Sequence, residues 1–140
     1  MDSKTLIAAL AVFLGGCVVE RDASLYPLDD GAKHTGVIQA QLVGHGNLHG
    51  TMDAMLPDGE ALKGQYSIVA GGSTGFGSII SAAGIASASG ISVSNEGQGS
   101  AFMYGDRGTT IQCEFYNNNM VGHGFGACRS SEGGTYKMIY

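Results

Sequence analysis

Three of the four histidines lie among glycines, and histidine is the side chain that most often binds metal ions in proteins. His45, His49 and His123 occur in two similar stretches, because the tetrapeptide Val-Gly-His-Gly is found at both 43–46 and 121–124. If the two stretches pack pseudo-symmetrically, His45 and His123 approach each other. A zinc site needs three or four ligands, and nothing in the sequence fixes the remaining ones. Exposed turn histidines are the simpler interpretation, and a histidine-dependent metal or ligand site is an alternative hypothesis.

No arrangement of residues indicates catalysis. Serines are plentiful, but a Ser-His-Asp set can be drawn between almost any residues in such a chain, so they indicate no particular site. The acids at 29–30 and 58–60 occupy predicted turns, where such residues are common for local backbone reasons. The stretch GGSTGFG at 71–77 superficially resembles a phosphate loop, but it lacks the lysine and the following amphipathic helix. We therefore expect a protein that is not an enzyme and that has no cofactor.

The three cysteines divide into one pair and one remaining residue. If the loop between Cys113 and Cys128 is symmetric, Tyr116 faces Phe125 and the two cysteines lie opposite each other on antiparallel strands. Opposed positions of this kind lie within the reach of a disulfide. Closing a loop of about 15 residues contributes roughly 3 kcal/mol in the chain-entropy model. We predict a structural disulfide between Cys113 and Cys128, which leaves Cys17 for other chemistry.

Cys17 follows a short apolar segment at the N-terminus. Lys4 precedes nine apolar residues at 6–14, and two glycines separate that run from the cysteine. This layout is typical of a secretory signal peptide, and the run is well short of the ~20 residues that span a bilayer. A short buried helix or an ordinary secretory peptide is the alternative. The tetrapeptide LGGC at 14–17 resembles the lipobox of bacterial lipoproteins, which implies a signal peptide at 1–16 and acyl chains such as palmitate on Cys17.

Two further stretches extend this resemblance over most of the remaining chain. They are PDGE-x-L-x-G-x-Y at 57–66 and a segment at 113–128 that ends in GHG-x-G-x-C. Together with the lipobox, they resemble a group of small Gram-negative outer-membrane lipoproteins of unknown function. Val18 stands where an aspartate would signal retention at the inner membrane. The resemblance therefore implies an outer-membrane protein, anchored by its lipid and facing the periplasm, and it implies no activity.

Composition and charge limit the classes of partner. Residues 17–140 are enough for one domain, and the net charge of the chain is −5. An acidic chain without a basic cluster argues against nucleic acid and against electrostatic docking on anionic lipid. The chain has 24 glycines, only 2 prolines and no tryptophan, which disfavours long helices and favours many tight turns. We therefore predict an all-β protein.

The alternation of apolar and polar residues predicts two three-stranded antiparallel meanders. We expect a lipidated tether at 17–33, followed by a single β-domain at 34–140 in which the meanders form a small sandwich or barrel. The turn at 57–60 carries proline and glycine where a tight turn needs them. The predicted strands are 37–43, 48–56 and 61–69 in the first meander, and 109–116, 125–129 and 135–140 in the second.

A segment rich in glycine, alanine and serine joins the two meanders at about 70–105. No charged residue occurs from 64 to 95. Its small residues at intervals of four suit close helix packing in a membrane or in an oligomer. It could equally form two strands with small side chains, or a mobile loop.

The sequence thus predicts a non-catalytic, lipid-anchored accessory or binding component of the cell envelope. Its partners would be the membrane, through the lipid on Cys17, and another envelope protein. The alternatives are insertion or oligomerisation through 70–105, and ligand or metal binding by the histidines.

Overall fold

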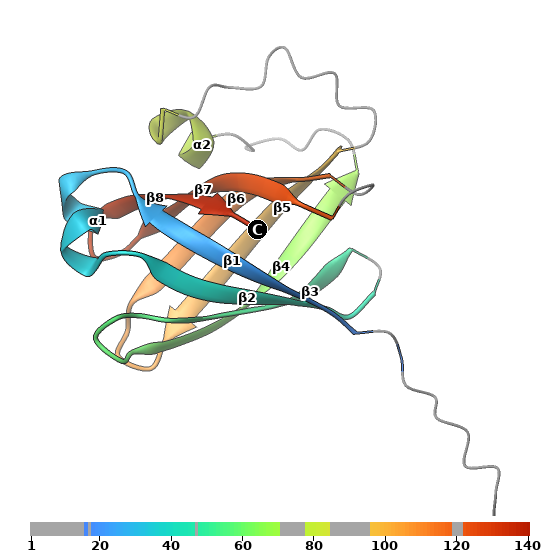
Figure 1. Cartoon of the computed structure of the whole chain (residues 1–140), viewed down its shortest axis with the longest axis horizontal. Coiled ribbons are helices and arrows are strands. Elements are labelled where there is room, and N and C mark those ends of the chain that lie inside the picture. The colour runs from blue at the N-terminus through green and yellow to red at the C-terminus, as the bar shows by residue number, and fades with distance from the viewer. Residues whose placement is uncertain (1–15, 17, 47, 71–77, 85–95, 119–121) are drawn as a thin grey trace, which may run out of the picture.

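Eight antiparallel strands pair in the order in which they follow one another along the chain, and the last strand pairs with the first (Figure 1). The computed structural model describes residues 16, 18–46, 48–70, 78–84, 96–118 and 122–140. The strands are β1 Val19–Pro27, β2 Ile38–Gly44, β3 His49–Met55, β4 Ala61–Ala70, β5 Glu96–Gly105, β6 Thr110–Asn118, β7 Gly124–Ser130 and β8 Gly134–Ile139, and the helices are α1 Asp30–Thr35 and α2 Ser78–Ala82. The all-β prediction is confirmed, with a closed barrel as the architecture.

Alternation along each strand separates the interior of the barrel from its outer wall. In β2, Ile38, Ala40 and Leu42 are buried, while Gln39 and Gln41 between them are exposed. Successive side chains of a strand point to opposite faces, so in a closed sheet every second residue points inward. The largest fully buried inward side chains are apolar, and they are Leu25, Ile38, Met52, Leu62, Met103, Ile111, Phe115, Tyr136 and Met138.

The two predicted three-stranded groups belong to one continuous wall. Strands β2, β3 and β4 are neighbours, as are β6, β7 and β8, but β5 pairs with both β4 and β6. The predicted segment 70–105 therefore contains a full barrel strand, Glu96–Gly105. Its strand character is weak in sequence because Gly97 and Gly99 occupy inward positions, where a strand normally shows its apolar residues. Residues 71–77 and 85–95 of that segment lie outside the described part of the chain.

The N-terminal strand closes the barrel, which corrects the prediction of a tether at 17–33. Residues Val19–Leu25 pair with β2, and Ser24–Pro27 pair with β8. The backbone groups of this segment thus find partners on both sides, and one of those partners is more than 100 residues away in the chain. Such a distant partner leaves no local pattern in the sequence.

Helix α1 covers one end of the barrel (Figure 1). Asp29 caps it, because one carboxylate oxygen accepts from the amide of Ala32 at 2.8 Å and the other accepts from the amide of Thr135 at 3.0 Å. Ala32 is fully buried in the core. Gly31 approaches the turn before β8 so closely that a Cβ atom would lie 2.0 Å from the carbonyl oxygen of Gly133. The predicted Asp-Asp-Gly turn is thus the beginning of a helix that is fixed to β1 and β8.

Helix α2 packs on the outer wall over β6 and β7. Ile79 and Ile80 are buried against Tyr116 and Ala127. The carboxylate of Glu114 accepts hydrogen bonds from the amides of Ile79 and Ile80, at 3.0 and 3.4 Å. Among the described residues, no helix is long and apolar enough to cross a membrane.

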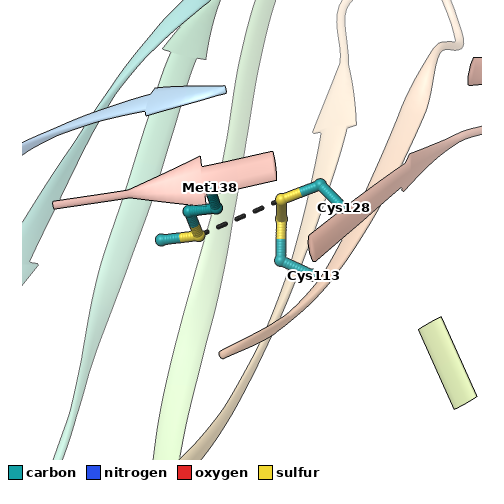
Figure 2. Close-up of a disulfide and its surroundings, with 3 residues drawn as sticks. All are labelled: Cys113, Cys128 and Met138. Atoms are coloured by element: carbon teal, nitrogen blue, oxygen red, sulfur yellow. Dashed lines mark hydrogen bonds between the residues drawn. A yellow bond between two sulfur atoms is a disulfide. The ribbon is translucent and has the colours of Figure 1, made fainter. Parts of the chain in front are cut away.

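The disulfide between Cys113 and Cys128 joins β6 to β7 inside the barrel (Figure 2). The two residues lie directly opposite each other, and Tyr116 lies opposite Phe125, as the symmetric-loop argument predicted. Both cysteines are fully buried, and the sulfur of Met138 lies 4.0 Å from that of Cys128. The predicted disulfide and its register are confirmed.

Candidate ligand-binding site at the barrel mouth

The two ends of the barrel carry different connections, and we call the end that α1 covers the closed end. The closed end carries α1 and the turns that follow β3, β5 and β7. We call the other end the mouth: there β1, β3, β5 and β7 begin and the other four strands finish. At the mouth, a cavity of about 260 Å³ enters the barrel, and its lining includes Arg21, Leu42, Tyr66, Ile68, Phe115 and Tyr140. These residues come from β1, β2, β4, β6 and the position directly after β8, so barrel closure is what assembles the cavity.

Three aromatic rings form the floor of this cavity. The ring of Phe115 makes edge-to-face contacts with those of Tyr66 and Tyr140, at centroid distances of 6.3 and 5.6 Å. Such contacts add to the stabilisation that comes from burial alone. The floor is therefore a packed and rigid surface in which two phenol groups flank a fully buried phenyl ring.

Each of the three rings lies against a glycine of the neighbouring strand. A Cβ atom at Gly50 would lie 2.7 Å from the ring of Tyr66, one at Gly99 would lie 2.2 Å from that of Phe115, and one at Gly124 would lie 2.3 Å from that of Tyr140. A larger residue at these positions would displace the rings. The inward glycines of β3, β5 and β7 thus make room for the aromatic floor.

Arg21 extends from β1 into the mouth. It shares the inward face of the strand with Ala23 and Leu25, which are 1% and 0% exposed. Its guanidinium group donates a hydrogen bond to the carbonyl oxygen of Gly122. A Cβ atom at Gly122 would lie 2.7 Å from that group, so only glycine allows this contact without displacement. The cation is therefore held by Gly122 in the cavity that the aromatic rings also line.

The two phenols of the mouth remain protonated at neutral pH. Burial raises the pKa of Tyr140 well above the ordinary value of 10.0, although the positive charge of Arg21 opposes this shift. Burial likewise raises the pKa of Tyr66, again against the effect of Arg21. The hydroxyl of Tyr140 donates to the side-chain oxygen of Asn117 at 3.0 Å. The mouth therefore combines one permanent cation, neutral hydroxyls and an apolar floor.

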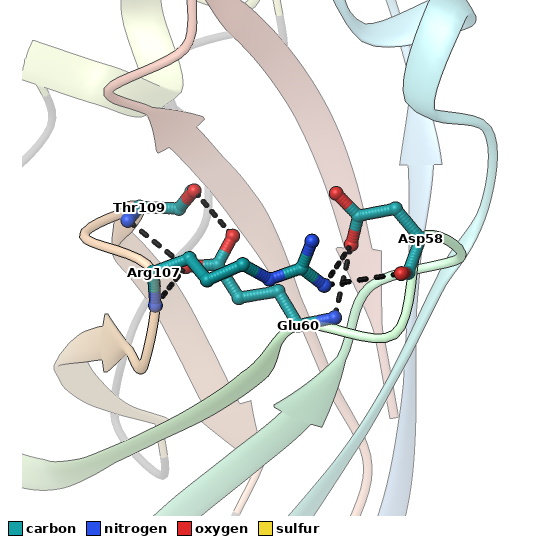
Figure 3. A network of polar contacts seen from close by, with 4 residues as sticks. All are labelled: Asp58, Glu60, Arg107 and Thr109. Atoms are coloured by element: carbon teal, nitrogen blue, oxygen red, sulfur yellow. Dashed lines mark hydrogen bonds and ion pairs between the residues drawn. The ribbon is translucent and has the colours of Figure 1, made fainter.

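The closed end contains charged groups of a different kind, in a network of the turns after β3 and β5 (Figure 3). Glu60 is 3% exposed. Its carboxylate accepts from the hydroxyl and amide of Thr109, at 2.7 and 3.1 Å, and from the amide of Arg107 at 3.0 Å. These hydrogen bonds, that from the Thr109 hydroxyl above all, lower the pKa of Glu60. Arg107 in turn forms an exposed ion pair with Asp58 at 3.4 Å.

The described part of the structure places His45, His49 and His123 around the mouth. His49 lines the cavity, and His45 and His49 also line an open groove of about 520 Å³ on the outer wall. His123 is exposed beside Gly122. In the part of the chain that is described, no three potential metal ligands come together. Cys17 lies outside the described residues, and Cys113 and Cys128 form the buried disulfide.

The residues that build the mouth carried only weak signals in the sequence. Arg21 fell within the predicted tether, and the aromatic residues were interpreted as core or girdle. One signal in the sequence could have revealed Arg21, namely the alternation along β1. Every second residue of that strand is apolar except Arg21, as the series Val19, Arg21, Ala23 and Leu25 shows. A charged residue in an otherwise apolar row marks a position that the fold alone does not explain.

Fold and site together define a class: an eight-stranded antiparallel barrel with a small, partly apolar cavity at one end. Barrels of this size either fill their interior with side chains or hold one small ligand. Comparisons with protein-family models, curated proteins and solved structures found no match to this chain. The resemblance to outer-membrane lipoproteins therefore stays a prediction from the sequence.

Proposed function

We propose that the protein is a non-catalytic outer-membrane lipoprotein whose barrel binds a small ligand at its mouth. The observation that carries this proposal is the cavity of about 260 Å³, which is lined by the cation of Arg21, the phenols of Tyr66 and Tyr140 and the ring of Phe115. Small-molecule sites are typically concave, mostly apolar and supplied with a few polar groups that fix orientation. This cavity supports the binding role that the sequence predicts.

The position of the mouth supports the anchoring part of this proposal. Val19 lines the cavity and begins β1, and only Val18 separates it from Cys17. An extended chain covers at most about 3.6 Å per residue, so the lipid-bearing cysteine would lie within about 7 Å of the barrel. A lipid on Cys17 would hold the mouth at the membrane surface and direct the closed end away from it. The ligand would then be exchanged next to the bilayer.

Anchoring is tested with the full chain, expressed in a Gram-negative cell as wild type and as Cys17→Ser. The measurements are incorporation of an alkyne-labelled palmitate and distribution between membrane and soluble fractions. We expect the wild type to be labelled and membrane-bound, because triple acylation anchors strongly, and the variant to be unlabelled and soluble. The double variant Cys113→Ser/Cys128→Ser is the matched control, and it should keep both label and membrane attachment. A membrane-bound Cys17→Ser protein would contradict lipid anchoring and favour attachment through another segment.

A further inference from the structure

We infer that the mouth cavity binds a small organic carboxylate with a short apolar chain, and that Arg21 is the group that binds the carboxylate. This inference rests on the proposed ligand-binding role and adds the chemical class of the ligand. It follows from three properties of the cavity: its charge, its donors and its size.

The charge of the cavity is positive and has no acidic partner in the described structure. The ion pairs among the described residues join Lys33 to Asp30 and Arg107 to Asp58, and neither involves Arg21. Removing a charge from water is costly unless an opposite charge or several hydrogen bonds compensate for it. A monoanion in the cavity would supply that compensation for Arg21.

The donors of the cavity match a carboxylate. A guanidinium group has five N–H donors in a planar fork that suits the two oxygens of a carboxylate. The Nη1 atom of Arg21 donates to Gly122, and the side chain of Arg21 lines the cavity, so a ligand would contact the donors of the fork that this bond does not use. The phenol of Tyr66 lines the same space, whereas the hydroxyl of Tyr140 already donates to Asn117. One cation with neutral hydroxyls favours a single negative charge over a phosphate dianion.

The apolar part of the cavity limits the rest of the ligand. Leu42, Ile68 and the ring of Phe115 line it. A volume of about 260 Å³ corresponds to roughly nine groups of water size at ~30 Å³ each. This admits an acid with about six or seven carbon atoms, together with its two oxygens, and is too small for a complete lipid. A lipid that inserted only the end of one acyl chain would place no carboxylate beside Arg21.

The test is calorimetric titration of the lipidated full-length protein in phosphatidylcholine nanodiscs, with empty nanodiscs as the blank. The probes are hexanoate, hexanol and hexylamine, which share an apolar chain and differ in charge. We expect hexanoate to bind at least about tenfold more tightly than hexanol, because hydrogen bonds to charged groups are the stronger kind. We expect no binding of hexylamine. Affinity should rise about fourfold per methylene from butanoate to hexanoate, as each methylene becomes buried.

Variants separate the role of Arg21 from that of the fold. Arg21→Gln should weaken hexanoate about tenfold or more and leave hexanol unchanged, and Arg21→Lys should keep a reduced preference for the acid. Arg129→Gln is the matched control, because Arg129 is exposed on the outer wall of β7, and it should bind like the wild type.

Two outcomes would overturn the inference in distinguishable ways. If the wild type binds hexanol as tightly as hexanoate, the cavity holds a ligand but the carboxylate assignment is wrong. This comparison needs no variant, so it decides the question even if Arg21→Gln does not fold. If none of the probes binds, the ligand-binding part of the proposed function is wrong as well, whatever the result for the anchor on Cys17.

Discussion

At the closed end of the barrel, the carboxylate of Asp29 accepts a hydrogen bond from the distant Thr135, and that of Glu60 accepts from Thr109 and Arg107, which also lie far away in the chain. At the mouth, Arg21 donates to a single carbonyl and has no acidic partner among the described residues. Both ends bring charged side chains close to the apolar interior. Only at the closed end does the protein itself supply the partners.

This difference assigns different roles to the two ends. Hydrogen bonds to the buried Glu60 tie the turn after β3 to the turn after β5, and the exposed cap Asp29 ties α1 to β8. A charge held in a concave site without an internal counter-charge is instead available to a ligand. We therefore interpret the closed end as structural and the mouth as functional.

The largest effect we expect concerns neither end alone, because the disulfide lies between them and supports both. Replacing both Cys113 and Cys128 with serine should lower the free energy of unfolding by about 3 kcal/mol, since the unfolded chain gains loop entropy. Urea denaturation of the variant and the wild type measures this. The wild type with and without reductant provides the control. A loss below about 1 kcal/mol would show that the disulfide is not a principal support of the barrel.

A smaller effect is expected from filling the space beneath the aromatic floor. Gly99→Val would displace the ring of Phe115 and should cost about 1–3 kcal/mol of unfolding free energy, the usual range for overpacking. It should also weaken hexanoate binding, because the floor of the cavity moves. Ser100→Val, which changes the adjacent exposed residue of β5, should change stability by no more than about 0.5 kcal/mol. Equal effects of the two variants would show that the floor is not rigid.

The smallest effect is a pH dependence that belongs to the closed end. The pKa of Glu60 is lowered in the folded state, so its contribution to stability is present above the ordinary value of 4.5 and is lost as the pH falls through the folded pKa. Thr109→Val removes the hydroxyl donor and raises the pKa of Glu60 towards that ordinary value. The Tm of the variant should be below that of the wild type at pH 7, and the difference should shrink in acid.

Thermal unfolding from pH 7 to pH 3 measures this difference, with Thr51→Val on the outer wall as the matched control. A difference that stayed constant with pH would contradict the role of Glu60. Binding of hexanoate at pH 7 should be unchanged in Thr109→Val, because Thr109 lies at the opposite end of the barrel.

The parts of the fold that the sequence predicts are those set by local pairing. The β6–β7 hairpin follows from a symmetric loop and two opposed cysteines, and the Pro57–Glu60 turn from residues with fixed backbone preferences. The sequence left β5 undecided because its inward positions include Gly97 and Gly99, which contribute no apolar side chains, and Gly99 accommodates the ring of Phe115. The inward glycines of β5 can be recognised as strand positions only when the pairing of β5 with β6 is known.

The candidate site was hidden for the same reason. In β1 the inward row contains Arg21, so the apolar alternation that would have revealed a strand is interrupted where the binding group lies. The partners of β1 are β2 and the distant β8, and no local pattern encodes that closure. The exposed histidines, by contrast, attracted attention through their spacing, although the described structure brings no third ligand to them.

The measurement that tests the account most directly is a titration of the ¹⁵N-labelled protein with hexanoate, followed through its backbone amide signals. The account predicts saturable shifts centred on Arg21, Tyr66 and Tyr140, and unchanged signals for Glu60 and Thr109. Shifts centred on the closed end, or no saturable shift anywhere, would contradict the assignment of the mouth as the binding site.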